Sequence, residues 1–327
     1  MNGKKLVSAV IPVFNEEKYI LKCISSLITQ DYGKDCIEFI FVDGGSTDKT
    51  IKLIEEAIVE LSFNGKVLDN PGRTAPAAMN IGIPVAEGDI IIRFDAHSTY
   101  PEDYISKCVK YLESTDAANV GGHWNIHGEG FVGECIAAVQ TSKFGVGATP
   151  YRVNKETRWV ESVPFGAFHK KLFDEIGLFN VELPRSEDNE LNYRIRKSGG
   201  RVLLAGDIYI DYYCRRTVKA FSKMAFSNGK GVGFTRKRYP GVMGIRYLIP
   251  FAFVISIILM LLAIVFSIKT AAPIFILEFF AYFSLDIMSA ISTKLSIAQK
   301  LFLIVLFPIY HISYGLGTIM GYFLKKM

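Results

Sequence analysis

Short apolar runs alternate with helix-patterned stretches along the first third of the chain. The apolar runs indicate four buried strands, at residues 6–14, 38–42, 66–68 and 89–94. Helical spacing marks the stretches between them, at residues 17–27, 46–61 and 76–84. Ser46 or Thr47 is a candidate cap for the second of these helices. Strands that alternate with helices predict a mostly parallel sheet covered on both faces, so we expect an α/β fold.

Polar residues follow three of the predicted strands directly. Asn15 follows the first strand, Asp43 the second and Asp95 the fourth. Ligands in open α/β sheets bind beyond the carboxyl ends of the strands. These three residues are therefore the first candidates for a binding site.

The pattern changes in the middle of the chain. Residues 121–158 are rich in glycine and polar residues and resist assignment, whereas residues 170–178 and 188–198 show helical spacing. Residues 217–230 form a predicted basic amphipathic helix. The apolar face of this helix comprises Phe221, Met224, Ala225 and Phe226. Such a helix is typical of a membrane interface, and an ordinary surface helix fits the same pattern.

The last quarter of the chain is apolar enough to enter a membrane. Residues 247–268 and 301–324 are each long enough to span a bilayer. Residues 270–293 between them are also apolar but contain Glu278 and Asp286. We expect three membrane helices, with an interfacial segment or a hairpin that does not fully span as the alternatives for the middle one.

Basic residues concentrate ahead of these segments. The net charge is only +5, which argues against nucleic acid as a partner, but residues 190–246 hold 13 Lys and Arg against 3 Asp and Glu. This block predicts contact with anionic headgroups or phosphates, with a solvated basic surface as the alternative. Arg236, Lys237 and Arg238 favour the inside for the large domain, although Lys325 and Lys326 would lie outside if three helices span.

The cysteines and the N-terminus also bear on localisation. The five cysteines are scattered without a CxxC pair, which indicates neither a zinc site nor a disulfide framework. The N-terminus lacks the pattern of a signal peptide. We therefore expect a multi-pass protein of the cell inner (plasma) membrane with its large domain in the cytoplasm.

Four segments carry residues suited to chemistry. They are IPVFNEE at residues 11–17, VDGGSTD at 42–48, RFDAH at 93–97 and SEDNEL at 186–191. An acid at a strand end followed by glycines can accept hydrogen bonds from a base or a ribose. A carboxylate and an imidazole two residues apart suit a transition metal such as Mn²⁺ better than an all-oxygen site would. Taken singly, each segment also fits an ordinary turn or helix cap.

Together and in this order, the segments resemble glycosyltransferase family 2, which has the GT-A fold. The resemblance covers about residues 6–215 and includes GRTAPAAMNIG and EGDIIIRFDAH. The stretches SKFGVGATPYR, VPFGAFHKKLFDEIGLF and DNELNYRIRKSGG are similar to succinoglycan-type exopolysaccharide glucosyltransferases, which also carry C-terminal membrane helices. We expect a GT-A domain over residues 1–214, a basic interfacial helix or linker over 215–245, and membrane helices over 246–327.

The resemblance implies a role for each matching position. Asp188 occupies the place of the catalytic base, in the family's ED motif. The nucleotide-sugar pocket would be lined by Pro12, Asn15, Glu16, Asp43, Arg73 and Asp95. The acceptor side would be lined by Glu187, Trp159 and Phe165. Trp159 and Phe165 could stack on a sugar face, with core packing as the alternative.

Two departures from the family pattern limit this transfer of roles. Asp95 and His97 stand where the family has its DxD motif, so His97 replaces a metal-binding acid and leaves the divalent cation open between Mn²⁺ and Mg²⁺. The QxxRW motif of processive synthases is absent, since the comparable residues 224–229 read MAFSNG. We therefore expect one sugar to be added per encounter.

The implied activity is an inverting, metal-dependent hexosyl transfer. The donor would be a nucleotide sugar, UDP-linked by resemblance, and the acceptor a saccharide on a polyprenyl diphosphate in bacterial-type exopolysaccharide or capsule synthesis. A polyprenyl-phosphate sugar synthase is the alternative enzyme. A non-catalytic nucleotide-sugar-binding scaffold of a polysaccharide assembly complex is the alternative of another class.

Overall fold

The structure is a computed structural model that describes residues 4–147, 149–266 and 272–327. The chain divides into two compact units. The first comprises Met1–Asn125 and Asn154–Tyr213, and the second comprises Ile126–Val153 and Cys214–Met327. The expected three-part division, with limits at residues 214 and 245, stays a prediction.

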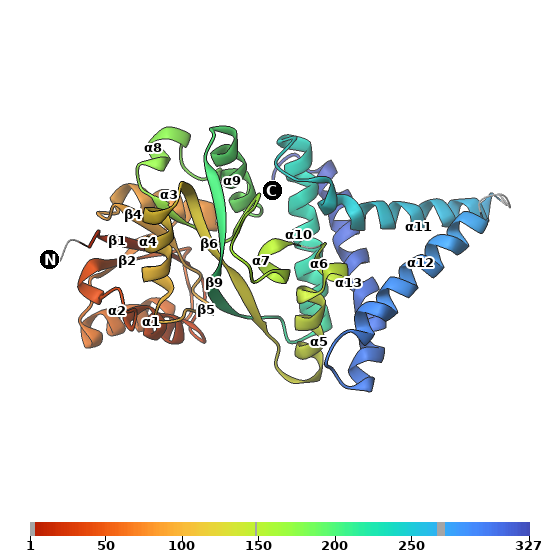
Figure 1. The fold of residues 1–327 in the computed structure, drawn as a ribbon, viewed down its shortest axis with the longest axis horizontal. Helices are drawn as coiled ribbons and strands as arrows, with labels where there is room; N and C mark the ends of the chain where they lie inside the picture. Colours follow the sequence, from red (N-terminus) through yellow and green to blue (C-terminus); the bar gives the residue numbers. More distant parts are fainter. Residues whose placement is uncertain (1–3, 148, 267–271) are drawn as a thin grey trace. The chain divides into compact units, whose positions relative to one another are not determined.

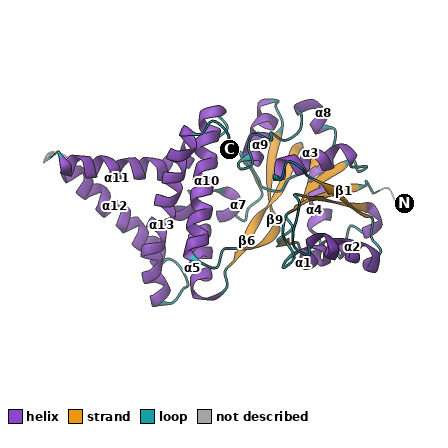
Figure 2. Cartoon of the chain, turned by 180° about the vertical axis from the view of Figure 1, so that it is seen from behind, coloured by secondary structure: helices purple, strands orange, loops and turns teal. Residues whose placement is uncertain are grey.

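A single mixed sheet forms the first unit (Figures 1 and 2). Its strand order is β3-β2-β1-β4-β8-β6-β9-β5, and β7 pairs with β9. The bounds of the strands are β1 Val7–Val13, β2 Ile37–Asp43, β3 Gly65–Asp69, β4 Ile90–Arg93, β5 Ser98–Thr99, β6 Ala117–His127, β7 Arg158–Trp159, β8 Ala167–His169 and β9 Arg201–Tyr213.

The four strands predicted from apolar runs are the parallel part of this sheet. β1 pairs with β2 in register from Val7↔Ile37 to Val13↔Asp43, and β1–β4 and β2–β3 are parallel as well. β8 joins β4 and β6 in antiparallel fashion, and β5 and β7 both run antiparallel to β9. The stretch at residues 121–158 that resisted assignment therefore supplies the end of β6 and the start of β7, together with short helices.

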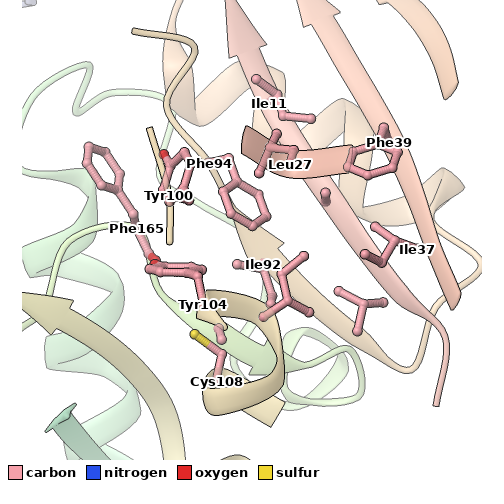
Figure 3. Close-up of a cluster of buried hydrophobic side chains, with 14 of the residues drawn as sticks. Ile11, Leu27, Ile37, Phe39, Ile92, Phe94, Tyr100, Tyr104, Cys108 and Phe165 are labelled. Carbon is pink, nitrogen blue, oxygen red and sulfur yellow. The ribbon is translucent and has the colours of Figure 1, made fainter. Parts of the chain in front are cut away.

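The helices of the first unit cover both faces of the sheet, as predicted. Their bounds are α1 Ile20–Ile28, η1 Lys34–Cys36, α2 Thr50–Leu61, α3 Ala75–Val85, α4 Tyr104–Ser114, α8 Leu172–Ile176 and α9 Glu187–Lys197. Figure 3 shows the core on one face, where Leu27 of α1 and Tyr104 of α4 pack with the strand residues Ile11, Phe39 and Ile92. α3 lies on the other face, against β1 and β2.

One predicted cap is wrong. α2 begins at Thr50, so neither Ser46 nor Thr47 caps it, and its N-cap residue Lys49 makes no side-chain capping bond. Ser46 is instead engaged with the strand before it, because its hydroxyl donates to Asp43 Oδ1 at 2.6 Å.

The described part of the second unit is helical. Its elements are α5 Gly130–Thr141, α6 Lys143–Val146, α7 Pro150–Val153, α10 Val218–Arg238, η2 Ile245–Leu248, α11 Ile249–Val265, α12 Ala272–Ile291 and α13 Ile297–Phe323. Three stretches in the described residues are long and apolar enough to cross a membrane: Ile245–Val265, Ala272–Ile291 and Ile297–Phe323. The predicted end of the first at 268 and start of the second at 270 lie outside the described residues.

The third membrane helix begins earlier than predicted, at Ile297 rather than at residue 301. A capping box explains the earlier start, since Ser296 accepts from the backbone of Gln299 and the Gln299 side chain accepts from the backbone of Ser296. The two reciprocal bonds satisfy amide groups that the first turn would otherwise leave unpaired.

The basic helix α10 packs directly along α13. Glycines permit the close approach, since a Cβ at Gly229 would lie 1.9 Å from the carbonyl oxygen of Tyr314 and one at Gly233 would lie 2.1 Å from that of Thr318. Small residues four apart are a common way for apolar helices to approach closely. Phe221 and Ala225 are buried on this face, whereas Phe226 is 38% exposed, and the predicted membrane-facing apolar side of the helix stays a prediction.

Candidate active site

The turn after β2 is built around the carboxylate of Asp43. Its Oδ2 accepts from the backbone N–H of Gly45 and of Ser46, both at 3.0 Å, and its Oδ1 accepts from the Ser46 hydroxyl at 2.6 Å. Aspartate favours such turns because its short side chain can reach amides two and three residues ahead. The carboxylate is therefore fixed at the end of the strand by its own local sequence.

The loop after β1 is joined to this turn. Asn15 Oδ1 accepts from the N–H of Thr47 at 2.8 Å, and the N–H of Asn15 donates to the Ser46 hydroxyl at 2.9 Å. The next amide, that of Glu16, donates to the Thr50 hydroxyl at 2.7 Å. These bonds hold the polar ends of two adjacent parallel strands together.

Arg73 and Pro12 lie at the same edge of the sheet. The guanidinium of Arg73 stands over Gly45, because a Cβ built on Gly45 would lie 3.5 Å from its Nη2. Pro12 is half-buried on β1, in register with Val42, one residue before Asp43. The structure thus gathers Pro12, Asn15, Asp43 and Arg73, whose roles in binding stay predictions.

Asp95 and His97 follow β4, and Glu16 joins them. The Nδ1 atom of His97 lies 2.8 Å from Asp95 Oδ1 and 3.1 Å from Glu16 Oε1. All three side chains are mainly covered, with exposed fractions of 31%, 16% and 19% for His97, Asp95 and Glu16. An imidazole between two carboxylates at these distances is an ion-pair network.

The electrostatics follow from that arrangement. The negative charge of Asp95 is the largest cause that raises the pKa of His97 to about 11; burial opposes the rise, and hydrogen bonds to Asp95 and Glu16 reinforce it. Burial would raise the pKa of Asp95, but the His97 charge and hydrogen bonds hold it below its ordinary value. Without other ligands, His97 is therefore an imidazolium paired with carboxylates.

Asp188 and Glu187 lie in the first turn of α9, and both are bound by Arg93. Arg93 Nη1 donates to Asp188 Oδ1 at 2.6 Å, and Arg93 Nη2 donates to Glu187 Oε1 at 2.9 Å. The arginine is the last residue of β4, two residues before Asp95, and its side chain is 7% exposed. The side chain of Asp188 is 20% exposed, so it is the more accessible end of this cluster.

The surroundings of Asp188 shift its proton affinity. Burial raises its pKa; the positive charge of Arg93 and a backbone hydrogen bond at Phe165 oppose the rise, Glu187 adds to it, and the pKa stands at about 7. Burial works against the charge of Arg93, but Asp188 and Glu187 together raise the pKa of Arg93 above its ordinary value. A carboxylate with a pKa close to neutral is suited to accept a proton from a hydroxyl and release it again.

A row of aromatic rings connects the Asp188 cluster to the His97 cluster. Phe165 stacks on Trp124 at 5.8 Å between ring centroids, Trp124 stacks on Tyr212 at 4.6 Å, and Tyr212 lies 6.1 Å from the His97 ring. The guanidinium of Arg93 lies 5.3 Å from the centre of the Phe165 ring. This row runs from the Asp188 cluster to the His97 cluster.

The two aromatic residues predicted for the acceptor side have different surroundings. Phe165 is 8% exposed and belongs to the aromatic row. Trp159 is 39% exposed on β7, and the Arg201 guanidinium lies 3.5 Å from the centre of its ring. One face of Trp159 is therefore already covered by a cation–π contact.

Backbone strain collects at this site. Five non-glycine residues in the described ranges have a positive φ, and four of them are Asn15, Arg73, Phe165 and Ser186. Asn15 and Arg73 flank the Asp43 turn, while Phe165 and Ser186 flank Asp188. Non-glycine residues in the left-handed region cost free energy and persist where surrounding contacts hold them, often at functional sites.

Two residues of the site are not predicted from the sequence. Arg93 lies in the RFDAH motif but has no predicted role, and Tyr212 has none either. An arginine inside an otherwise apolar strand was the available signal for the first, since a buried guanidinium needs acidic partners. Tyr212 offered no comparable signal.

The proteins that this chain resembles identify its family. The family model described as glycosyl transferase family 2 matches residues 8–177. The chain is 32% identical over 268 residues to the dolichyl N-acetyl-alpha-D-glucosaminyl phosphate 3-beta-D-2,3-diacetamido-2,3-dideoxy-beta-D-glucuronosyltransferase of Methanococcus voltae, an alignment that covers 80% of this chain and 81% of that protein. It is 30% identical over 245 residues to the succinoglycan biosynthesis protein ExoA of Rhizobium meliloti, with 74% of each covered.

A solved structure supports the fold over nearly the whole chain. The mannosyltransferase PcManGT from Pyrobaculum calidifontis, in complex with GDP-Man and Mn²⁺, aligns with a TM-score of 0.66 at 17% identity, covering 97% of this chain and 88% of that one. These findings confirm the predicted resemblance and the GT-A fold followed by apolar helices.

Proposed function

Because the chain belongs to glycosyltransferase family 2, and is therefore a glycosyltransferase that acts on nucleotide sugars, we propose that it adds one sugar to a lipid-linked saccharide by a single displacement. The observation that carries the proposal is Asp188, a mainly covered carboxylate with a pKa of about 7 beside a buried arginine. A base of this kind matches the need to deprotonate an attacking hydroxyl at neutral pH.

The donor would bind at the joined ends of β1 and β2. Asp43 presents a carboxylate whose orientation is set before any ligand arrives. Its three donors are the Gly45 N–H, the Ser46 N–H and the Ser46 hydroxyl, and they leave one of the about four acceptor positions of a carboxylate for a ribose hydroxyl. Arg73 supplies a positive charge beside the same turn. Asn15, Pro12 and Glu16 complete the pocket in this proposal.

A divalent cation fits the residues after β4. In the described ranges no group of three or more His, Cys, Asp or Glu side chains is arranged to hold a metal ion by itself. His97 would give up its proton when a cation binds, and Asp95 and His97, now 2.8 Å apart as an ion pair, would then offer one carboxylate and one imidazole, a donor pair that suits Mn²⁺. Diphosphate oxygens of the donor would supply further ligands. When bound, the cation would neutralise charge on the leaving diphosphate.

In the proposed transfer one proton moves, one bond forms and one bond breaks. The acceptor hydroxyl oxygen attacks the anomeric carbon of the donor sugar, and its proton passes to a carboxylate oxygen of Asp188. The bond from that carbon to the diphosphate oxygen breaks, and the electron pair leaves with the nucleoside diphosphate. A single displacement inverts the anomeric centre, so an α-linked donor gives a β-linked product.

The acceptor is proposed to lie at a membrane surface. The chain is membrane-associated through three C-terminal helices of spanning length. The relative from Methanococcus voltae is named for a dolichyl-phosphate-linked sugar, and the relative from Rhizobium meliloti for a polysaccharide. We infer a polyprenyl-diphosphate saccharide as the acceptor, with UDP on the donor and with Glu187, Trp159 and Phe165 on the acceptor side of a cytoplasmic domain.

A donor screen tests the proposal. Membranes that carry the full chain are incubated with lipid extract and single nucleotide sugars, and released nucleoside diphosphate and glycosylated lipid are both measured. We expect release and lipid product with one donor, loss of both in Asp188→Asn, and no change in Asp174→Asn, an exposed acid on α8 that serves as the matched control. Transfer to polyprenyl monophosphate itself would identify the alternative synthase, and donor binding without any transfer would identify a scaffold.

A further inference from the structure

We propose that Arg93 is a positioning residue, which holds the Asp188 carboxylate in place and divides its single positive charge between Asp188 and Glu187. The inference rests on the proposed role of Asp188 as the base. It adds two residues, Arg93 and Glu187, to the account of how that base works.

The geometry leaves the guanidinium little freedom. Its two terminal nitrogens each bind a different carboxylate, at 2.6 Å for Asp188 and 2.9 Å for Glu187. The Phe165 ring centre lies 5.3 Å and the Phe179 ring centre 6.0 Å from Cζ of Arg93. A planar fork with fixed donor directions orients its carboxylate partners more strictly than a lysine ammonium would.

The backbone on both sides of the contact is fixed as well. The N–H of Arg93 donates to the carbonyl of Gly166 at 3.1 Å, which ties the end of β4 to the segment that leads into β8. Phe165, the residue before Gly166, has a φ of 50° and makes a backbone hydrogen bond to Asp188. Arg93 and the strained segment at Phe165 therefore position the same carboxylate from two directions.

The charges do not balance within this cluster. Arg93 of β4 and Glu187 of α9 both face Asp188, and Asp95 acts on Arg93 from two residues along the chain. An arginine committed to Asp188 alone would stabilise its ionised form and make it a weak base. Because Glu187 takes the second nitrogen and adds a negative charge nearby, Asp188 keeps a higher affinity for the proton of the acceptor.

This arrangement makes two substitutions move Asp188 in opposite directions. Arg93 lowers the pKa of Asp188 and Glu187 raises it. Removal of the arginine charge should therefore raise the pKa further, and removal of the glutamate charge should lower it. A residue that only supported the fold would change the amount of active enzyme without moving the pH dependence.

The test measures kcat/KM against pH for the full chain in membranes, with the donor found in the screen. We expect Arg93→Gln to move the acidic limb up by at least about one pH unit, with activity partly regained at high pH, and Arg93→Lys to move it less. Glu187→Gln should move the limb down. Arg196→Gln removes the same charge from an exposed position on α9 and should leave the limb in place.

Two outcomes would overturn the proposal: a limb that stays fixed while activity falls in both Arg93→Gln and Glu187→Gln, or a shift in the same direction in both. Melting of the solubilised chain reports folding, and if Arg93→Gln does not fold, the direction of the Glu187→Gln shift alone decides. Asp188→Asn in the same assay separates the two hypotheses. If turnover survives in Asp188→Asn, Asp188 is not the base. If Asp188→Asn is inactive and the acidic limb does not move in Arg93→Gln or Glu187→Gln, only the role of Arg93 is removed.

Discussion

The Asp43 turn and the Asp188 cluster both hold a carboxylate near the ends of the parallel strands, but by different means. Asp43 is held by amides and a hydroxyl from residues two and three positions ahead. Asp188 is held by a charged side chain 95 residues away in sequence. Neutral partners at fixed distances set a shape, whereas a buried ion pair also sets proton affinity. The first arrangement suits binding and the second suits proton transfer.

The largest effect is expected when the charge of Asp188 is removed, which tests whether this carboxylate transfers a proton. Asp188→Asn keeps the shape of the side chain and its contact with Arg93 but removes the proton acceptor. Turnover should fall by at least about 10²-fold while donor affinity persists. Turnover is measured as nucleotide release, and donor affinity by titration of the full chain. Near-normal turnover would show that Asp188 is not the base.

Removal of the divalent cation tests the proposed metal-binding role of Asp95 and His97. Excess chelator should lower turnover on the order of 10²-fold, because the leaving diphosphate loses its neutralising charge. Wild type should prefer Mn²⁺ over Mg²⁺, and His97→Asp should move the preference toward Mg²⁺, which favours oxygen ligands. Full activity in chelator contradicts the metal requirement, and an unchanged Mn²⁺/Mg²⁺ ratio in the variant contradicts the role of His97.

The pH dependence of the wild-type chain tests the proton affinity of Asp188. The pKa of Asp188 is raised from 3.8 to about 7, and only the ionised form can accept a proton. kcat/KM should therefore rise with pH up to about 7 and fall about tenfold for each unit below it. Rates measured over a pH series in constant ionic strength check this. An acidic limb close to pH 4 would mean that the base has an ordinary carboxyl pKa.

Asp43 should give the smallest effect and a different kind of effect. Asp43→Asn keeps an acceptor oxygen for the turn but loses the charge, and hydrogen bonds to charged groups are stronger than neutral ones by about 1 kcal/mol. Donor affinity should fall about fivefold, with turnover at saturating donor nearly unchanged. A fall in turnover as large as that of Asp188→Asn would erase the distinction between the two regions.

The same contrast explains how much the sequence predicts. The β1–β4 strands, the edge at Asn15, Asp43 and Asp95, and the membrane-length helices follow from local apolar patterns, and all are found. The turn chemistry of Asp43 is local too, although the sequence pattern predicts its partner Ser46 as a helix cap. Local patterns are read reliably because their partners are neighbours in the chain.

The rest depends on contacts between distant segments. β6 shows no regular alternation of apolar and polar residues, and β8 has only 3 residues, so the sequence alone does not identify either as a strand. The burial of β6 is decided by the strands that pair with it. The pairing of Arg93 with Asp188 and the approach of Glu16 to His97 join residues 95 and 81 positions apart. Such pairings follow from the sheet order, which no single segment specifies.

The anomeric configuration of the product tests the central claim most directly. Single displacement with Asp188 as base requires the new glycosidic bond to have the opposite configuration to the bond in the donor. Proton NMR of the purified glycolipid gives this configuration from the coupling between H-1 and H-2 of the transferred sugar, for donors whose H-2 is axial. The account predicts inversion, and retention would contradict it, because retention leaves Asp188 no role as the base of a single displacement.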